Sequence, residues 1–109
     1  MAFALRRRNA PVPTQSAVME SLGVQGETMI PLQVLPGRCY LVAAGIVRGE
    51  PRGLRLSAEL SGRVHKDEAR DRMEGVALAF CAQSETSVPI RVSARGSSPW
   101  WALRVWPMD

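Results

Sequence analysis

The sequence has no long apolar run and very little histidine or lysine. No apolar run approaches the roughly 18 residues that a membrane-spanning helix needs, so we expect no transmembrane segment. His65 is the only histidine and Lys66 is the only lysine. Zinc sites and nucleophilic dyads need several partners around a histidine, and this chain cannot readily assemble them. We therefore expect no metal site, no cofactor and no enzymatic activity.

The positive charge comes almost entirely from arginine. Thirteen arginines and one lysine stand against ten acidic residues, and the net charge is +4. Such a skew is typical of GC-rich coding and is weak evidence for a polyanion partner. The N-terminal stretch contains a run of three arginines, Arg6, Arg7 and Arg8, without further basic residues or interleaved aromatics. Such a short run is weak evidence for binding of nucleic acid or anionic lipid. We expect a solvated tail or an arm that docks on an acidic neighbour, and nucleic acid is disfavoured.

One polar stretch gathers enough carboxylates to raise the alternative of a calcium site. The residues are Asp67, Glu68, Asp71 and Glu74. Their spacing does not match an EF-hand loop, and Lys66, Arg70 and Arg72 are available as internal partners. Charge runs are usually solvated. We therefore expect a self-neutralised loop or short helix here.

The length of 109 residues allows one domain with one core. Residues 1–26 read as an N-terminal arm, in which Ser16–Leu22 favours one or two helical turns. From Glu27 onward, short apolar stretches alternate with Gly, Pro and charged clusters, as in an antiparallel all-β domain. The sequence predicts a β-sandwich over residues 27–109, jelly-roll or immunoglobulin-like, with about seven strands.

Alternation assigns the faces of individual strands. Leu54–Leu60 and Val88–Ala94 each alternate apolar and polar residues, so each should have one buried and one wet face. Arg38–Val47 and Val76–Ala82 are apolar on both faces, which predicts central positions. Pro31 lacks an amide donor and places the strand Thr28–Leu35 at an edge or at a bulge. We expect turns at residues 50–53 and 95–99, before a last strand at Trp100–Trp106.

The two cysteines lie in the apolar strands predicted to be central. Cys39 and Cys81 are therefore predicted to form a disulfide that joins two strands, with two buried free thiols as the alternative. A disulfide favours an oxidising, periplasmic or extracellular location. Against this, Met1–Leu5 is too short for the apolar core of an export signal. The basic residues also follow this stretch, whereas an export signal has its basic residues first, so no signal peptide is expected.

Several stretches follow one another in an order known from a family of bacterial domains. Leu35–Tyr40 opens a strand at Cys39, Leu54–Leu60 precedes Ser-Gly-Arg-Val, Val76–Phe80 leads into Cys81, and Val88–Ala94 precedes a Gly-Ser-Ser turn and Trp101–Val105. Over Val34 to Trp106 this order resembles the bacterial pre-peptidase C-terminal type of β-sandwich, especially the cysteine-containing versions in exported proteins of predatory and myxobacterial species.

The resemblance implies a non-catalytic accessory domain that binds surfaces, glycans or protein neighbours. Members of the family often carry an aspartate before the strand that begins here at Gly53-Leu54. This chain has Arg52-Gly53 instead, so the resemblance implies no polar or metal role at that position.

The last strand carries the main candidate binding residues. If Trp101, Leu103 and Val105 enter the core, then Trp100, Arg104 and Trp106 lie on the opposite face, with the two indoles about 20 Å apart. Such indoles could anchor a protein or stack on sugar rings. Alternatively, they simply cover the ends of the sandwich.

The sequence thus predicts a non-catalytic protein-interaction module of a bacterial envelope or exported system. We expect it to dock through an aromatic edge strand, with Trp100, Arg104 and Trp106, and through the arm with Arg6, Arg7 and Arg8. A self-assembling structural subunit is the first alternative, because an arm and an apolar edge strand allow arm exchange or strand addition. A carbohydrate-binding module is the second.

Overall fold

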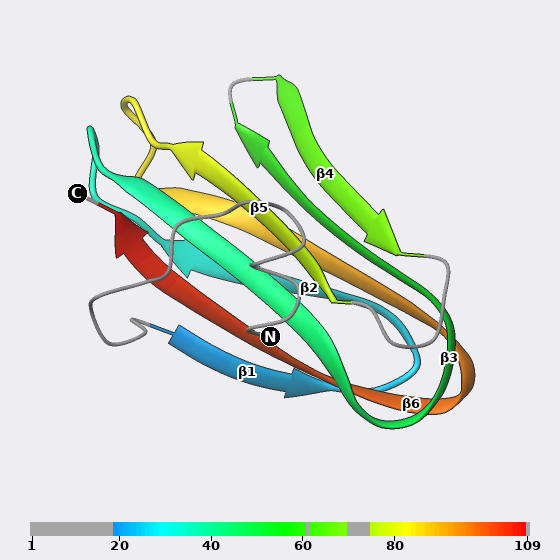
Figure 1. The fold of residues 1–109 in the computed structure, drawn as a ribbon. Helices are drawn as coiled ribbons and strands as arrows, with labels where there is room; N and C mark the ends of the chain where they lie inside the picture. The colour runs from blue at the N-terminus through cyan, green and yellow to red at the C-terminus, as the bar shows by residue number, and fades with distance from the viewer. Residues whose placement is uncertain (1–18, 61, 70–74, 109) are drawn as a thin grey trace.

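The fold is all-β, as predicted. A computed structural model describes residues 19–60, 62–69 and 75–108, which form six antiparallel strands and no helix (Figure 1). The strands are β1 (Met19–Gly23), β2 (Gly26–Gln33), β3 (Cys39–Leu60), β4 (Arg63–Ala69), β5 (Val76–Cys81) and β6 (Ser87–Met108). Among these residues, none belongs to a helix long and apolar enough to cross a membrane.

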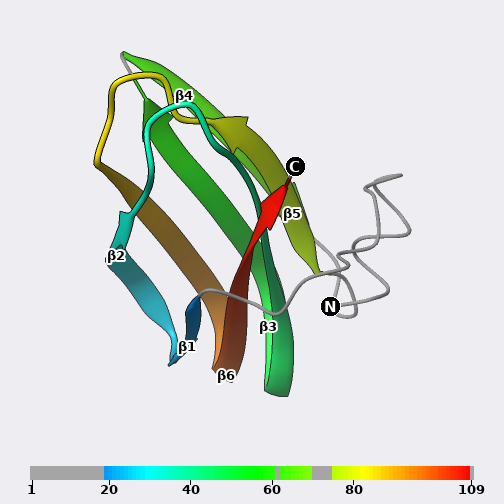
Figure 2. The same cartoon turned by 90° about the vertical axis from the view of Figure 1, so that its left-hand side faces the viewer.

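Strands β3 and β6 organise the sheet. Each is 22 residues long, and they pair with each other from Cys39 opposite Met108 to Ala58 opposite Ile90. Both bend at the same end of the molecule (Figure 1). The bend folds one continuous sheet into two layers that face each other across the core (Figure 2).

Each layer contains half of each long strand and two short strands. Layer I has the order β1, residues 100–108 of β6, residues 39–46 of β3, and β5. Layer II has the order β2, residues 87–95 of β6, residues 54–60 of β3, and β4. This is the strand order of a jelly roll, so the structure selects the jelly-roll form of the predicted sandwich.

The bends lie where the sequence predicts turns between separate strands. Instead, β3 continues through residues 50–53 with register shifts, and β6 continues through residues 95–99. Gly49 has a φ of 94° and Ser98 a φ of 51°. Gly49 also lies so close to β6 that an added Cβ would overlap the Ser98 carbonyl. Residues 50–53 and 95–99 do change the direction of the chain, as predicted, but they bend two paired strands instead of ending them.

The core fills the space between the layers. The predicted inward faces are confirmed for Leu54–Leu60 and for Val88–Ala94, whose alternate residues are buried. Trp101 is fully buried at the bent end of layer I. Its indole occupies the space that a Cβ on Gly23 would take, and its Nε1 donates a hydrogen bond to the Val24 carbonyl at 3.2 Å. The largest core side chain therefore connects β6 to the end of β1.

The N-terminal part of the sandwich begins earlier than predicted. The helical turn expected at Ser16–Leu22 is wrong for its described part, because Met19–Gly23 forms strand β1 and pairs with Val105–Trp101. Residues 16–18 lie outside the described residues. Met19 packs against the core, so tertiary contacts override a weak local helix preference. Residues 19–23, predicted to be part of the arm, thus contribute a strand to layer I.

Edge positions follow the prediction for β2 but not for β5. Among the described residues, β2 pairs with β6 alone, and Pro31 stands opposite Pro89, so the predicted edge strand is confirmed. Within the same part of the chain, β5 pairs with β3 alone, so it lies at an edge there and not at a central position. Strand β5 is apolar on its outward face because Ala77 belongs to a second apolar cluster, which lies on the outer face of layer I.

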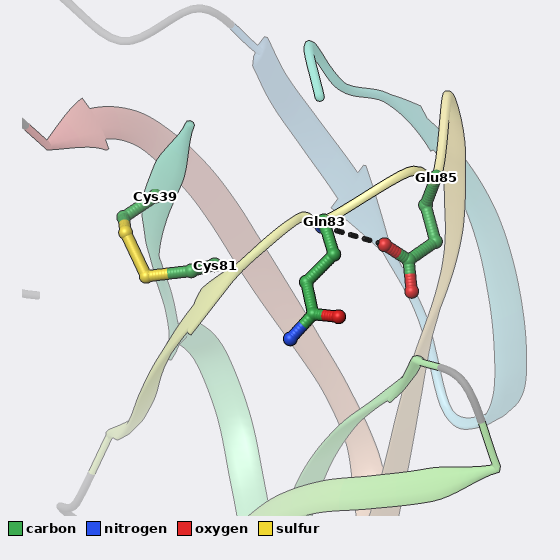
Figure 3. Close-up of a disulfide and its surroundings, with 4 residues drawn as sticks. All are labelled: Cys39, Cys81, Gln83 and Glu85. Atoms are coloured by element: carbon green, nitrogen blue, oxygen red, sulfur yellow. Dashed lines mark hydrogen bonds between the residues drawn. A yellow bond between two sulfur atoms is a disulfide. The ribbon is translucent and has the colours of Figure 1, made fainter. Parts of the chain in front are cut away.

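The predicted disulfide is confirmed. Cys39 and Cys81 are bonded and stand directly opposite each other on β3 and β5, at the end of layer I remote from the bend (Figure 3). Backbone hydrogen bonds continue beyond the bridge, from Gly37 N to Ala82 O at 2.8 Å and from Ala82 N to Arg38 O at 2.9 Å. The bridge is compatible with an oxidising compartment.

The loop after β5 is ordered by its own polar contacts. Gln83 N donates to Glu85 Oε1 at 2.7 Å, as Figure 3 shows. Val34 N donates to Thr86 O at 3.0 Å, which ties this loop to the segment after β2. The disulfide-bearing end of the molecule is therefore held by both covalent and hydrogen bonds.

We predict that Gly49→Ala destabilises the fold far more than Gly62→Ala. Both glycines have positive φ, so both variants lose about 1 kcal/mol or more to backbone strain. Only Gly49 has backbone within contact range, whereas nothing lies within 4 Å of a Cβ on Gly62. Urea unfolding should show a further loss of about 1–3 kcal/mol for Gly49→Ala. Equal losses would contradict the close approach at the bend.

We predict that reduction of the disulfide lowers the free energy of unfolding by up to about 4 kcal/mol, because the bridge closes a loop between residues 42 positions apart. Denaturant unfolding with and without dithiothreitol measures the difference. The Cys39→Ser/Cys81→Ser double variant is the control and should be insensitive to the reductant. Identical stability of the oxidised and reduced protein would refute the prediction.

Candidate interaction surface

The last strand presents its two faces as predicted, but it is not an edge. Trp101, Leu103 and Val105 are fully buried, and the alternate residues lie on the outer face of layer I. Residues 100–108 of β6 lie between β1 and β3 and are hydrogen-bonded to both. The expectation of an aromatic edge strand is therefore wrong, because β1 occupies the edge that the sequence assigned to this strand.

The three predicted binding residues of this strand lie in different surroundings. Trp100 is 45% exposed. Arg104 is exposed, and its Nε lies 3.2 Å from Glu20 Oε1 on β1. Trp106 is half-buried and packs against a cluster that contains Leu41. They therefore do not form one continuous ridge.

An exposed apolar group surrounds Trp100. We call it the Trp100 patch, and its members are Leu22 (69% exposed), Val24 (48%), Val47 (62%) and Trp100 (45%). Leu22 pairs with Ala102, two residues from Trp100 on the same face. Val24 directly follows Gly23, which pairs with Trp101, so it reaches the level of Trp100 from β1. Val47 precedes Arg48, which pairs with Trp100 from the other side.

Sequence reasoning missed most of this patch. Leu22 was placed in a helix and Val24 in an arm, whereas Val47 was placed at the end of a strand with no assigned face. The available signal was the alternation of the apolar Leu22 and Val24 with Ser21 and Gly23, which is too short to distinguish a strand from a helix.

A second apolar group lies on the same outer face, toward the disulfide. We call it the outer cluster, and it contains Leu41, Ala43 and Ala77, with Trp106 and Met108 packed against it. Leu41 is 2% exposed and Ala43 is fully buried, although both point away from the core. The apolar character of β3 and β5 on both faces, noted in the sequence, is the signal of this cluster.

The middle of the outer face of layer II is polar, although Met29 and Val64, both 60% exposed, also lie on that face. An open depression of about 230 Å³ is lined by Glu27, Arg55, Ser57, Arg91 and Ser93. Arg91 Nη1 lies 3.6 Å from Glu27 Oε1, and both side chains are more than half exposed. Exposed ion pairs of this kind contribute little stability. Layer II therefore has the water-facing surface expected of an antiparallel sandwich, in contrast with layer I.

The remaining candidate residues have structural environments. His65 is half-buried on β4 opposite Ala58. Asp67 Oδ2 accepts a hydrogen bond from Ala77 N at 3.0 Å, so this carboxylate ties β4 to the start of β5. Asp71 and Glu74 lie outside the described residues, as do Arg6, Arg7 and Arg8. Within 19–60, 62–69 and 75–108, no three metal-ligating side chains come together.

No protein-family model matches the sequence, and no curated protein does. Among solved structures, a de novo designed double-stranded beta-helix is similar to this chain. It is 16% identical, with a TM-score of 0.46, and the match covers 84% of this chain and 100% of the designed one.

We predict that Trp106→Ala destabilises the protein more than Trp100→Ala. Trp106 packs against the outer cluster, so its truncation should cost about 1–3 kcal/mol, whereas truncation of a largely exposed Trp100 should cost under about 1 kcal/mol. Thermal unfolding by circular dichroism compares the two variants. A larger loss for Trp100→Ala would mean that Trp100 is the one held by packing.

Proposed function

We propose that this domain is a non-catalytic protein-interaction module that docks on a folded protein partner through the Trp100 patch. The observation that carries the proposal is the exposure of four neighbouring apolar side chains from three segments of layer I. Scattered apolar residues are normal on a protein surface, but a contiguous group centred on a tryptophan is typical of an interface.

The support under the patch favours tight binding. Trp100 is adjacent in sequence to the fully buried Trp101, on a strand that is hydrogen-bonded on both sides. The position of its backbone is therefore determined before any partner arrives. Preorganisation lowers the entropic cost of association, so more of the binding energy of the indole contributes to affinity.

The rim of the patch gives the expected chemistry of the partner. Arg48, exposed and opposite Trp100, places a cation at one side. The Arg104 and Glu20 pair lies along the other side, beside an open depression of about 510 Å³ that Leu22 and Ala102 also line. A partner with an apolar pocket for the indole and a carboxylate facing Arg48 fits this surface.

The disulfide supports a place in the bacterial envelope or among exported proteins, periplasmic or extracellular, because such bonds persist in oxidising compartments. The resemblance to pre-peptidase C-terminal domains agrees with this placement and remains a prediction. In that setting the domain would act as an accessory module, with Arg6, Arg7 and Arg8 adding a basic segment before the fold.

We predict that Trp100→Ala weakens binding to a protein partner, isolated by copurification with the domain, by about 30-fold or more, the loss typical of an interface hot spot. Met29→Ala is the matched control, because Met29 is 60% exposed but lies on β2 in layer II. Titration calorimetry with the purified partner measures both, and thermal unfolding verifies that both variants are folded. Unchanged affinity of Trp100→Ala would reject the patch as the docking site.

Two further measurements separate the alternatives. If sedimentation shows a concentration-dependent dimer that Trp100→Ala abolishes, the patch serves self-assembly and the proposed partner is wrong. If a glycan array shows binding that Trp100→Ala removes, while no protein partner is found, the domain is a carbohydrate-binding module instead.

A further inference from the structure

The outer face of layer II is hollowed along its two central strands. Two open depressions lie there, of about 230 Å³ and about 160 Å³, and they adjoin because both are lined by Ser57 and Arg91. We call them together the layer II groove. Its other lining residues are Glu27, Arg55 and Ser93 in the first depression, and Glu59, Val64 and Pro89 in the second.

The groove is hollow because short side chains alternate with long ones across the strand pair. Ser93 pairs with Arg55, and Ser57 pairs with Arg91. The two serines are half-buried and the two arginines are exposed, so the hydroxyl groups lie lower than the guanidinium groups beside them. Two hydroxyls and two guanidiniums therefore surround one small volume.

The charges of the groove favour an anionic group at its middle and hydroxyl groups at its ends. A guanidinium binds a carboxylate or sulfate through two parallel hydrogen bonds, and Arg91 belongs to both depressions. Arg91 Nη1 also lies 3.6 Å from Glu27 Oε1, but an ion pair this exposed is weak, so a second anion can share the guanidinium at little cost. Glu27 and Glu59 lie in different depressions, where their carboxylates can accept hydrogen bonds from hydroxyl groups.

We propose that the layer II groove binds an acidic polysaccharide, with a carboxylate or sulfate of the sugar chain held by Arg55 and Arg91. The hydroxyls of a sugar unit match the serines and glutamates of the groove, and its C–H face matches Val64 and Pro89. Each depression is smaller than the roughly 300 Å³ at which enclosing ligand pockets begin. The groove therefore suits successive units of a chain that lies across the sheet better than one enclosed small molecule.

The glutamates of the groove disfavour a nucleic acid as the occupant. A nucleic acid strand carries a phosphate at every unit, so its phosphates would meet Glu27 and Glu59 as well as the arginines. A polysaccharide carries its acidic groups among neutral hydroxyls, which matches both kinds of side chain. The groove lies on layer II and the Trp100 patch on layer I, so this inference is independent of the proposed docking on a protein partner.

Titration of the full-length, isotope-labelled protein, followed by the shifts of its amide resonances, tests the proposal. The probes are an oligogalacturonate, which carries carboxylates, a heparin oligosaccharide, which carries sulfates, and a neutral maltooligosaccharide, all at about 0.15 M ionic strength. We expect the resonances of residues 55–57 and 91–93 to shift with at least one acidic probe and not with the neutral one. The acidic probe that binds more tightly identifies the charged group. No shift with either acidic probe, equal shifts with the neutral probe, or shifts confined to layer I would overturn the proposal.

Substitution of one guanidinium separates the groove from a general attraction to a basic protein. Arg91→Gln should weaken binding of the acidic probe by about 10-fold or more, the loss expected when a hydrogen bond to a charged group is removed. Arg38→Gln is the matched control, because it removes the same charge from an exposed position beside the disulfide, away from the groove. Equal losses in the two variants would overturn the proposal. A loss with Trp100→Ala but not with Arg91→Gln would place the polysaccharide on layer I and would overturn it as well.

Discussion

The pairing of β3 with β6 is the constraint on which the rest of the structure depends. The two strands run together through both layers and bend at the same level, so each contributes its backbone to both halves of the sandwich. Strands β1, β2, β4 and β5 each add to one half of this pair. Gly49 permits the bend, because only a residue without a Cβ fits against the Ser98 carbonyl there. The long-range register therefore depends on a few positions near the centre of two strands.

The two layers have different outer surfaces. The middle of layer II presents serine and arginine outward, whereas layer I presents two apolar groups at its two ends. The outer cluster lies toward the disulfide and is already buried, while the Trp100 patch lies toward the bend and is open. Trp106 and Trp100 lie on the same face of one strand. Trp106 packs against the outer cluster, whereas Trp100 is exposed and is the proposed binding residue.

Local patterns predicted what depends on alternation. The buried faces of Leu54–Leu60 and Val88–Ala94 follow from an alternation with a period of two residues. The disulfide was predicted because each cysteine lies in an apolar strand. The predictions that were wrong concern features determined by residues far away in the sequence. Turn residues at 50–53 look alike whether they end a strand or bend it, and β5 is apolar on both faces although it is an edge. Alternation placed Trp106 outward but could not show that it packs against the cluster that contains Leu41.

The arrangement of the terminal strands determines how the domain responds to tension. Strand β1 begins at Met19 opposite Val105, and β6 ends three residues later at Met108, so the two ends of the described fold leave layer I side by side. A force that pulls these ends apart would load the hydrogen bonds between β1 and β6 one after another, like a zipper, instead of all at once. The bridge between β3 and β5 lies outside that load path. Strand β1 could therefore peel away at low force and carry Leu22 with it, while the strands behind it stay together.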